Sequence, residues 1–189
     1  STFGAAMADG FDPTSDDSDE TTGPNWPPQP DFGPLSIVDR TTRFGTFKYR
    51  ANPTPGNAEG IVITDSWAAK NIVQVEVPQL KNIASGGKVS FHERGAGQLV
   101  RLFQDWEDEG LIDKVLTWGG SWAPRFIRGS RTTLSNHAWA TAFDINAQWN
   151  PLGARPALLG SKGCVRELVS AANRNGFYWG GHFRTRSDG

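Results

Sequence analysis

Hydrophobic and polar side chains alternate over residues 141–146, which is typical of a strand with one buried face. Phe143 and Ile145 occupy one side of this segment, and Asp144 occupies the other. Residues 61–63 and 72–77 are rich in β-branched side chains and predict two more strands. Residues 115–118 predict a short strand of the same kind. The pattern therefore predicts several short strands, one of which presents a carboxylate.

Helical periodicity appears in two segments. In residues 92–109 the apolar side chains recur at helical spacing, and Gly110 is a stop signal. The apolar positions of this segment are Ala96, Leu99, Val100, Phe103 and Trp106. Residues 161–175 predict a second helix, closed by Gly176. Together these elements predict an α+β fold in which a small antiparallel sheet packs against helices.

The first 34 residues differ in composition from the rest. Residues 12–20 are acidic and almost free of apolar side chains, and residues 24–34 are rich in proline. Such a segment buries too little apolar surface to offset the entropy lost on ordering. We therefore expect a flexible acidic and proline-rich arm over residues 1–34 and one globular domain over residues 35–189.

Composition excludes several classes of protein. The chain has 189 residues, with 19 basic and 20 acidic side chains, so it lacks the basic character typical of nucleic-acid-binding domains. No apolar run approaches the ~20 residues that cross a bilayer, and no signal peptide is visible. Cys164 is the single cysteine, which excludes an internal disulfide and predicts a buried thiol while leaving the redox compartment undetermined.

The chemistry of the chain centres on His137 and Asp144. One imidazole and one carboxylate are ligands that Zn²⁺ accepts, and a turn between them can bring His137 back toward the strand that carries Asp144. Spacing alone favours the simpler interpretation, a core histidine near a turn carboxylate.

Three sequence blocks resemble those of one enzyme family. Residues 135–146 (SNHAWATAFDIN) resemble the signature of the zinc D,D-carboxypeptidase and L-alanyl-D-glutamate endopeptidase superfamily. This superfamily includes vancomycin-resistance D-alanyl-D-alanine peptidases and phage endolysins. Residues 118–126 (WGGSWAPRF) resemble its segment with a substrate-binding arginine, and residues 176–183 (GFYWGGHF) resemble its block of aromatic residues and glycines.

The resemblance implies a role for each matching residue. His137 and Asp144 would bind Zn²⁺, Arg125 would bind a carboxylate of the substrate, and Asp188 would act as the catalytic base. In this family the third metal-binding histidine follows the acidic residue, so we expect it beyond Gly189, at a C-terminal end that looks incomplete. The other departure is Ala140, where the family usually has glycine; a methyl group is tolerated unless the position needs φ > 0.

Several nearby residues leave two interpretations open. Arg128 and Arg131 either bind carboxylates or form a solvated basic loop. Ser135 either orients substrate or a metal ligand, or caps a turn. His182 either lines the cleft or substitutes for the missing metal ligand. His92, at a predicted helix start, is expected to be structural or exposed.

The resemblance implies a monomeric Zn²⁺ peptidase whose partner is the peptidoglycan stem peptide. It would act at the bacterial cell wall or in the periplasm, with delivery by a phage as one route. The first hypothesis for its activity is an L-alanyl-D-glutamate endopeptidase of the lysin type, and the second is a D-alanyl-D-alanine carboxypeptidase. A third hypothesis, of another class, is a non-catalytic module that binds peptidoglycan.

Overall fold

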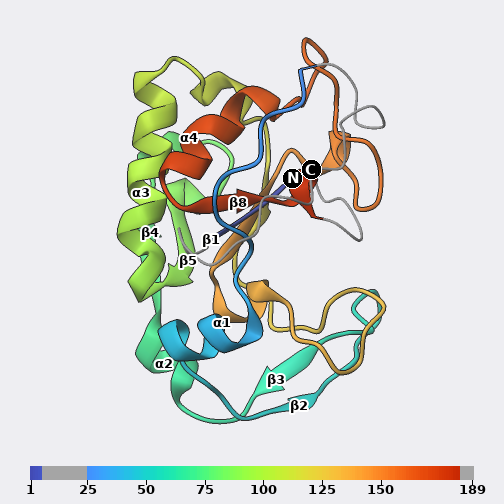
Figure 1. Ribbon diagram of the computed structural model, residues 1–189. Helices are drawn as coiled ribbons and strands as arrows, with labels where there is room; N and C mark the ends of the chain where they lie inside the picture. The colour runs from blue at the N-terminus through green and yellow to red at the C-terminus, as the bar shows by residue number, and fades with distance from the viewer. Residues whose placement is uncertain (6–24, 184–189) are drawn as a thin grey trace.

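The computed structural model describes residues 1–5 and 25–183. It contains both helices and antiparallel strands, which confirms the predicted α+β fold (Figure 1). The helices are α1 (Ile37–Phe44), α2 (Trp67–Asn71), α3 (Glu93–Asp108) and α4 (Val169–Arg174). The strands are β1 (Thr2–Ala5), β2 (Tyr49–Ala51), β3 (Ile61–Ile63), β4 (Ile72–Glu76), β5 (Lys88–His92), β6 (Trp118–Gly120), β7 (Ala142–Ile145) and β8 (Phe177–Trp179).

The main sheet has four strands in the order β6-β7-β1-β8, and all neighbours are antiparallel. The register pairs Phe3 with Phe143 and with Trp179, so these three rings lie on one face. Thr2, paired with Asp144, lies on the opposite face because successive side chains alternate across a strand. The sheet therefore separates an aromatic core from a face that carries the candidate carboxylate.

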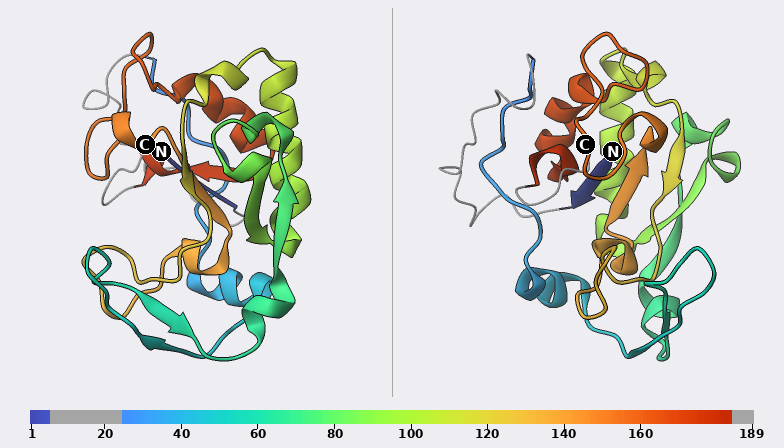
Figure 2. Two further views of the ribbon diagram at one scale, coloured as in Figure 1. Left: turned by 180° about the vertical axis from the view of Figure 1, so that it is seen from behind. Right: turned by 90° about the vertical axis from the view of Figure 1, so that its right-hand side faces the viewer.

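Helix α3 packs against the aromatic face of this sheet (Figures 1 and 2). Trp106 is fully buried and meets Phe3 and Phe143 edge-on, with ring centroids 5.8 and 6.3 Å apart. Leu99 is also fully buried, as the helical periodicity predicted, whereas Val100 is 40% exposed and lies outside the buried stripe. Burial of this stripe fixes the helix against the sheet.

The predicted flexible arm is wrong for its first five residues, because Thr2–Ala5 form β1 between β7 and β8. Phe3 is completely buried in the core. Trp26 also contacts the fold, with its ring 4.8 Å from that of Trp179. Residues 6–24, which include the acidic run, lie outside the described part of the chain, so their flexibility stays a prediction.

Two predicted strands lie where the pattern placed them, at β3 and β4, whereas the third begins later than expected. Residues 115–118 were predicted to be a strand, but the strand there, β6, is Trp118–Gly120. The backbone N–H groups of Leu116 and Thr117 both donate to Asn146 Oδ1, at 2.8 and 3.2 Å. These two N–H groups thus bond to a buried side chain instead of to the backbone of a neighbouring strand.

The helix predicted over residues 161–175 begins later than expected. A short 3₁₀ turn covers Arg166–Leu168, and α4 begins at Val169. Gly163 has φ +83°, and a Cβ there would lie 2.4 Å from the Trp149 ring. A residue in this left-handed conformation does not fit an α-helix, so the helix does not run through residue 163. Cys164 is buried as predicted, although it precedes the helix.

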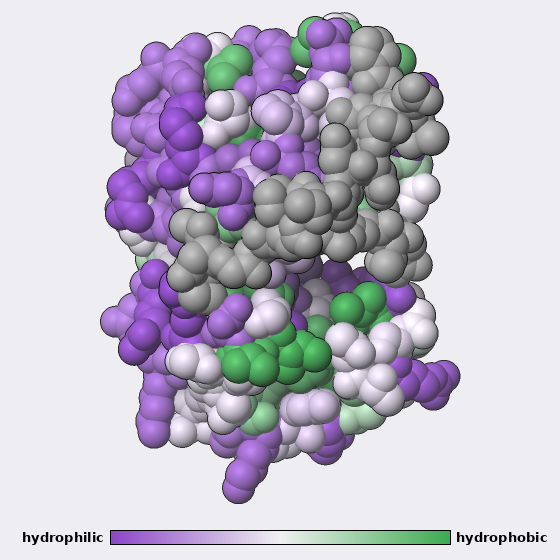
Figure 3. Space-filling model, in the orientation of Figure 1, coloured by the Kyte–Doolittle hydropathy of each residue, from purple (hydrophilic) through white to green (hydrophobic). Residues whose placement is uncertain are grey.

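The lower part of the molecule in Figure 1 contains α1, α2 and the β2–β3 pair. Ser36 caps the N-terminus of helix α1, because its hydroxyl oxygen accepts a hydrogen bond from the backbone N–H of Asp39 at 3.1 Å. Apolar side chains gather over α1 on the surface in Figure 3, where Ile37 and Val38 are 63% and 72% exposed. Among the described helices, none has the length and apolar character needed to span a membrane.

His92 joins β5 to α3, and its role is structural. Its Nδ1 accepts a hydrogen bond from the backbone N–H of Arg94 at 3.0 Å, and its Nε2–H donates to the Phe44 carbonyl at 3.1 Å. A neutral imidazole satisfies both contacts, whereas a proton on Nδ1 would break the helix cap. Burial accordingly lowers the pKa of His92 below its usual value of about 6.5.

We expect the protein to lose stability as the pH falls from 7.5 to 5. A histidine whose pKa is lowered by folding binds a proton in the unfolded state first, so the unfolded state gains stability below about pH 6.5. Thermal unfolding at several pH values measures this loss. His92→Asn, which keeps a capping side chain without a titrating ring, should show a smaller loss than the wild type. An identical pH dependence in both proteins would contradict the assignment.

Candidate active site

A tight turn brings His137 back over the strand that follows it. Ser135 caps the turn, because its hydroxyl oxygen accepts a hydrogen bond from the backbone N–H of His137 at 3.2 Å. The turn ends at Ala140, which has φ 54° and ψ 42°, and β7 begins two residues later. This left-handed conformation favours glycine, the residue usual in the family, and costs alanine roughly 1–2 kcal/mol. The departure at Ala140 is therefore tolerated with strain.

The structure brings His137 and Asp144 together, as predicted. His137 Nε2 lies 3.2 Å from Asp144 Oδ2, and His137 is 6% exposed. His137 Nδ1 lies 3.3 Å from the Ser121 carbonyl oxygen, which can only accept a hydrogen bond. A neutral ring that donates through Nδ1 presents the lone pair of Nε2 to the carboxylate. A lone pair on His137 Nε2 and a carboxylate oxygen of Asp144 repel each other at 3.2 Å unless a cation lies beside them. That cation is either a proton or a metal ion.

Asp144 is held from its other side by β1. The Thr2 hydroxyl donates to Asp144 Oδ1, which leaves Oδ2 facing His137. Burial on its own would raise the pKa of Asp144. Its contacts with His137 and the hydrogen bond from Thr2 outweigh burial, so the pKa of Asp144 lies below its usual value. Asp144 therefore remains a carboxylate at neutral pH.

Gly119 gives β6 the space to cross Asp144 closely. A Cβ at this position would lie 3.0 Å from the Asp144 Cβ, which is tighter than an ordinary van der Waals contact. Gly119 therefore has a steric reason to be a glycine, because a side chain there would collide with Asp144. Ser121, two residues after Gly119, supplies the carbonyl that orients His137.

The donor pair fits two of the ligands of a catalytic zinc. Two ligand atoms about 2.1 Å from a tetrahedral zinc lie roughly 3.4 Å apart, close to the observed 3.2 Å between Nε2 and Oδ2. The Ser121 carbonyl and the Thr2 hydroxyl provide the outer hydrogen bonds that orient such ligands. Within residues 1–5 and 25–183, no group of three metal-binding side chains is present.

The geometry does not support His182 as a substitute third ligand. Its Nε2 lies 2.8 Å from the Pro27 carbonyl oxygen, to which it donates, and its ring packs among Trp26, Tyr178 and Trp179. No metal-binding group in the described part of the chain includes it. Asp188, the predicted base, lies outside the described residues, so its role stays a prediction.

A cavity of about 710 Å³ opens beside His137. It is bounded by β1, by residues from α1 and by the loops that precede β7. The predicted substrate-binding residues Arg125, Arg128 and Ser135 all line it. Arg125 therefore shares a cavity with His137, as an arginine that holds a substrate carboxylate must.

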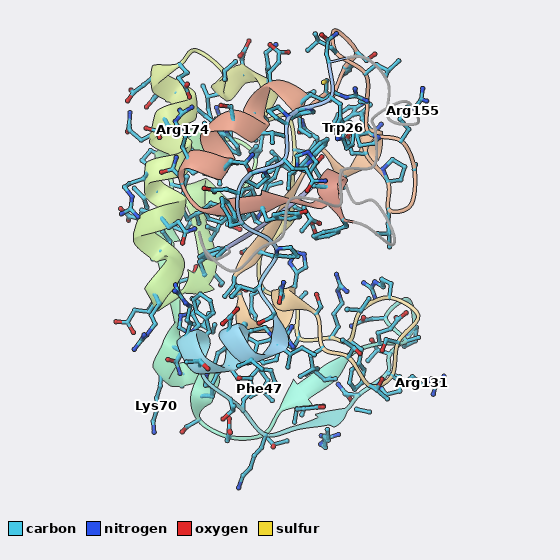
Figure 4. All side chains as sticks on the ribbon, in the orientation of Figure 1. Trp26, Phe47, Lys70, Arg131, Arg155 and Arg174 are labelled. Atoms are coloured by element: carbon cyan, nitrogen blue, oxygen red, sulfur yellow. The ribbon has the colours of Figure 1, made fainter. Side chains whose placement is uncertain are left out.

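Arg128 and Arg131, which follow Arg125 in the chain, differ in their surroundings. Arg128 pairs with Glu59 at 3.1 Å, and Glu59 also accepts a hydrogen bond from the backbone N–H of Gly129. That backbone contact, together with Arg128, keeps the pKa of Glu59 below its usual value. Arg131 is exposed, and Figure 4 shows it at the outer end of its loop, pointing away from the protein. The solvated-loop interpretation therefore describes Arg131 better than carboxylate binding does.

Two residues near the site could not be recognised from the sequence pattern. Thr2 reaches Asp144 from a four-residue strand that is too short for a recognisable pattern. Arg40 reaches the cavity from α1, nearly a hundred residues before His137 in the chain. Only the tertiary structure brings these two segments to the turn that carries His137.

Residues 128–189 match a family model described as D-alanyl-D-alanine carboxypeptidase. This part of the chain carries a peptidase family signature. The match covers about a third of the sequence and includes Ser135, His137 and Asp144, which confirms the resemblance seen in the sequence. No curated protein and no solved structure matches the chain significantly.

Proposed function

We propose that this protein is a zinc peptidase that hydrolyses an amide bond in peptidoglycan stem peptides. The single observation that carries the proposal is the His137–Asp144 pair, 3.2 Å apart, on the wall of a cavity that Arg125 also lines. The match to a peptidase family over the same residues supports it. A third ligand from outside the described residues completes the metal site in this proposal.

In this proposal the residues of the cleft have three roles: metal binding, substrate binding and proton transfer. His137 and Asp144 hold the metal ion, and Ser121 and Thr2 keep their donor atoms aimed at it. Zinc at this position would polarise the scissile carbonyl and acidify the attacking water. Arg125 binds a substrate carboxylate and so fixes the scissile amide beside the pair. Asp188 takes the proton of the water and passes it to the leaving amine.

Among stem-peptide bonds, we favour the one between L-alanine and D-glutamate. D-Glutamate in these peptides is linked through its γ-carboxyl group, so its α-carboxylate is free next to the scissile amide. The peptide that follows carries at least one more carboxylate. A cavity lined by Arg40, Arg125 and Arg128 suits a substrate with several carboxylates.

Cleavage of the terminal D-alanyl-D-alanine bond is the second candidate. The description of the matching family model favours it. There too, the residue whose amine leaves carries a free carboxylate, so Arg125 would have the same role in both reactions.

Mass spectrometry of peptidoglycan digested by the protein with added zinc tests the proposal. We expect fragments that begin with D-glutamate. Release of free D-alanine would instead identify the carboxypeptidase. Binding to peptidoglycan without any new fragment would identify the non-catalytic module, and neither binding nor cleavage would refute all three. His137→Ala is the matched control, because it removes a ligand and leaves the arginines of the cleft in place.

Arg125→Ala is expected to lower kcat/KM by roughly 10- to 100-fold, the effect of losing a hydrogen-bonded pair with a charged group. Zinc content should not change, because Arg125 is not a ligand. Steady-state kinetics and metal analysis measure both quantities. Arg131→Ala is the matched control, since Arg131 is exposed and is not among the residues that line the cavity. Full activity in Arg125→Ala would contradict the role in substrate binding.

A further inference from the structure

Arg40 is a buried cation on the wall of the cleft. It lies near the middle of α1 and is 7% exposed, yet it lines the same cavity as Arg125 and His137. Burying a charged group is costly unless the charge is paired. The surroundings of Arg40 therefore need an explanation.

The hydrogen bonds of Arg40 use only part of its guanidinium. Nη1 donates to the Leu134 carbonyl at 3.0 Å and to Asn136 Oδ1 at 2.9 Å. The guanidinium carbon lies 3.9 Å from the centre of the Trp139 ring, so one flat face is covered. Nε is buried without a partner, and Nη2 has no acceptor among the described residues. The guanidinium is thus fixed in place, while the N–H groups of Nε and Nη2 remain available as hydrogen-bond donors.

No carboxylate in residues 1–5 or 25–183 forms an ion pair with Arg40. Arg128, on the same cavity, has Glu59 as its partner. Burial without a nearby acid lowers the pKa of Arg40 to about 10, which still leaves it charged at neutral pH. The charge of Arg40 therefore differs from that of Arg128 in lacking a described counterion.

The partners of Arg40 also fix its position relative to the reacting centre. Leu134 and Asn136 belong to the segment that leads into the turn with His137, and Trp139 belongs to that turn. The guanidinium is therefore anchored to the turn that carries a candidate metal ligand, although it belongs to α1. A guanidinium that is planar, fixed in position and without an ion-pair partner suits the recognition of a carboxylate through two parallel hydrogen bonds.

We propose that Arg40 binds a second carboxylate of the substrate, distinct from the carboxylate held by Arg125. The ligand is an anionic peptide with two free carboxylates, one bound at each arginine. This inference rests on the proposed function and adds a residue that determines specificity for doubly charged peptides. A purely structural role, in which Arg40 only fastens α1 to the turn, is the competing explanation.

The test uses three peptides that differ only in charge. The parent is N-acetyl-L-alanyl-γ-D-glutamyl-L-lysine, with its alanyl–glutamyl amide N-methylated to resist hydrolysis. The second has the glutamyl α-carboxylate converted to a carboxamide, and the third has the C-terminal carboxylate converted in the same way. Calorimetry gives the dissociation constant of each peptide for the full chain and its variants.

For the wild type, we expect each amidation to weaken binding about tenfold, as the loss of a charge-assisted pair predicts. In Arg40→Gln, one of the two effects should disappear while the other remains. Arg43→Gln is the matched control: Arg43 is an exposed arginine of the same helix, so both effects should persist. Arg40→Lys, which keeps the charge but loses the fork, should retain part of the preference and covers the case in which Arg40→Gln does not fold.

Three other results would overturn the inference. Both amidation effects could persist in Arg40→Gln. Alternatively, that variant could bind all three peptides more weakly by the same factor, which is the result that a structural role predicts. Failure of the parent peptide to bind the wild-type protein would refute the proposed function as well, so the two failures are distinguishable.

Discussion

His137→Ala is expected to lower kcat/KM by at least roughly 1000-fold, because it removes the nitrogen that faces Asp144 across 3.2 Å. A catalytic zinc contributes several kcal/mol of transition-state stabilisation, and ~4 kcal/mol corresponds to about this factor. Asp144→Asn should have a similar effect, since an amide keeps the shape of the carboxylate and can accept from Thr2 but carries no charge. Zinc affinity should fall in both variants.

Steady-state kinetics and metal analysis measure these losses, and thermal unfolding shows whether each variant still folds. Asp113→Asn is the matched control for charge, because Asp113 is exposed and does not line the cavity, and it should behave like the wild type. If His137→Ala kept more than a tenth of the activity, the metal-ligand assignment would be wrong. The pair would then be an ordinary hydrogen bond between a core histidine and an aspartate.

Phe3→Ala is expected to lower the free energy of unfolding by about 3–5 kcal/mol, the usual cost of removing a fully buried phenylalanine ring. Phe3 is completely buried, and its ring stacks on Phe143 with centroids 5.5 Å apart and meets Trp106 edge-on. Its strand also pairs with β7 and β8. The substitution therefore leaves a void in the centre of the sheet.

Urea unfolding measures this change through the midpoint and slope of the transition. Val38→Ala is the control, because Val38 is 72% exposed and its replacement should change the free energy of unfolding by less than about 0.5 kcal/mol. The flexible arm expected from composition predicts no effect for Phe3→Ala. A loss below about 1 kcal/mol would therefore favour a flexible arm and place residues 1–5 outside the sheet.

A consequence of the central strand is that stability and activity share residues 1–5. Phe3 fills the aromatic core, while its neighbour Thr2 points to the opposite face and holds Asp144. The alternation of a β-strand puts these two roles on adjacent residues. A substitution that displaces this strand should therefore weaken both the fold and the proposed metal site.

The spacing of apolar side chains was enough to predict one long helix and three strands. Helix α3 and strands β3, β4 and β7 are specified by the periodicity of their own side chains, which burial against a neighbouring element requires. His137 and Asp144 could be paired from the sequence because a single short turn separates them, and the family resemblance named the same pair. Arg125 was found in the same way, through a motif close to it in the chain.

The tertiary structure decided what local pattern cannot encode. β1 is four residues long and contains a glycine, so it shows no periodicity, and only pairing with β7 and β8 makes it a strand. Gly163 has a left-handed conformation and packs closely on Trp149 from another segment, and this conformation interrupts the helix predicted from residue 161. Thr2 and Arg40 reach the site across more than ninety residues of sequence, as their bonds to Asp144 and Asn136 show. Such contacts depend on the packing of the whole chain. Burial and hydrogen bonding stabilise groups that are distant in the sequence once the fold brings them together, and no local pattern marks those groups.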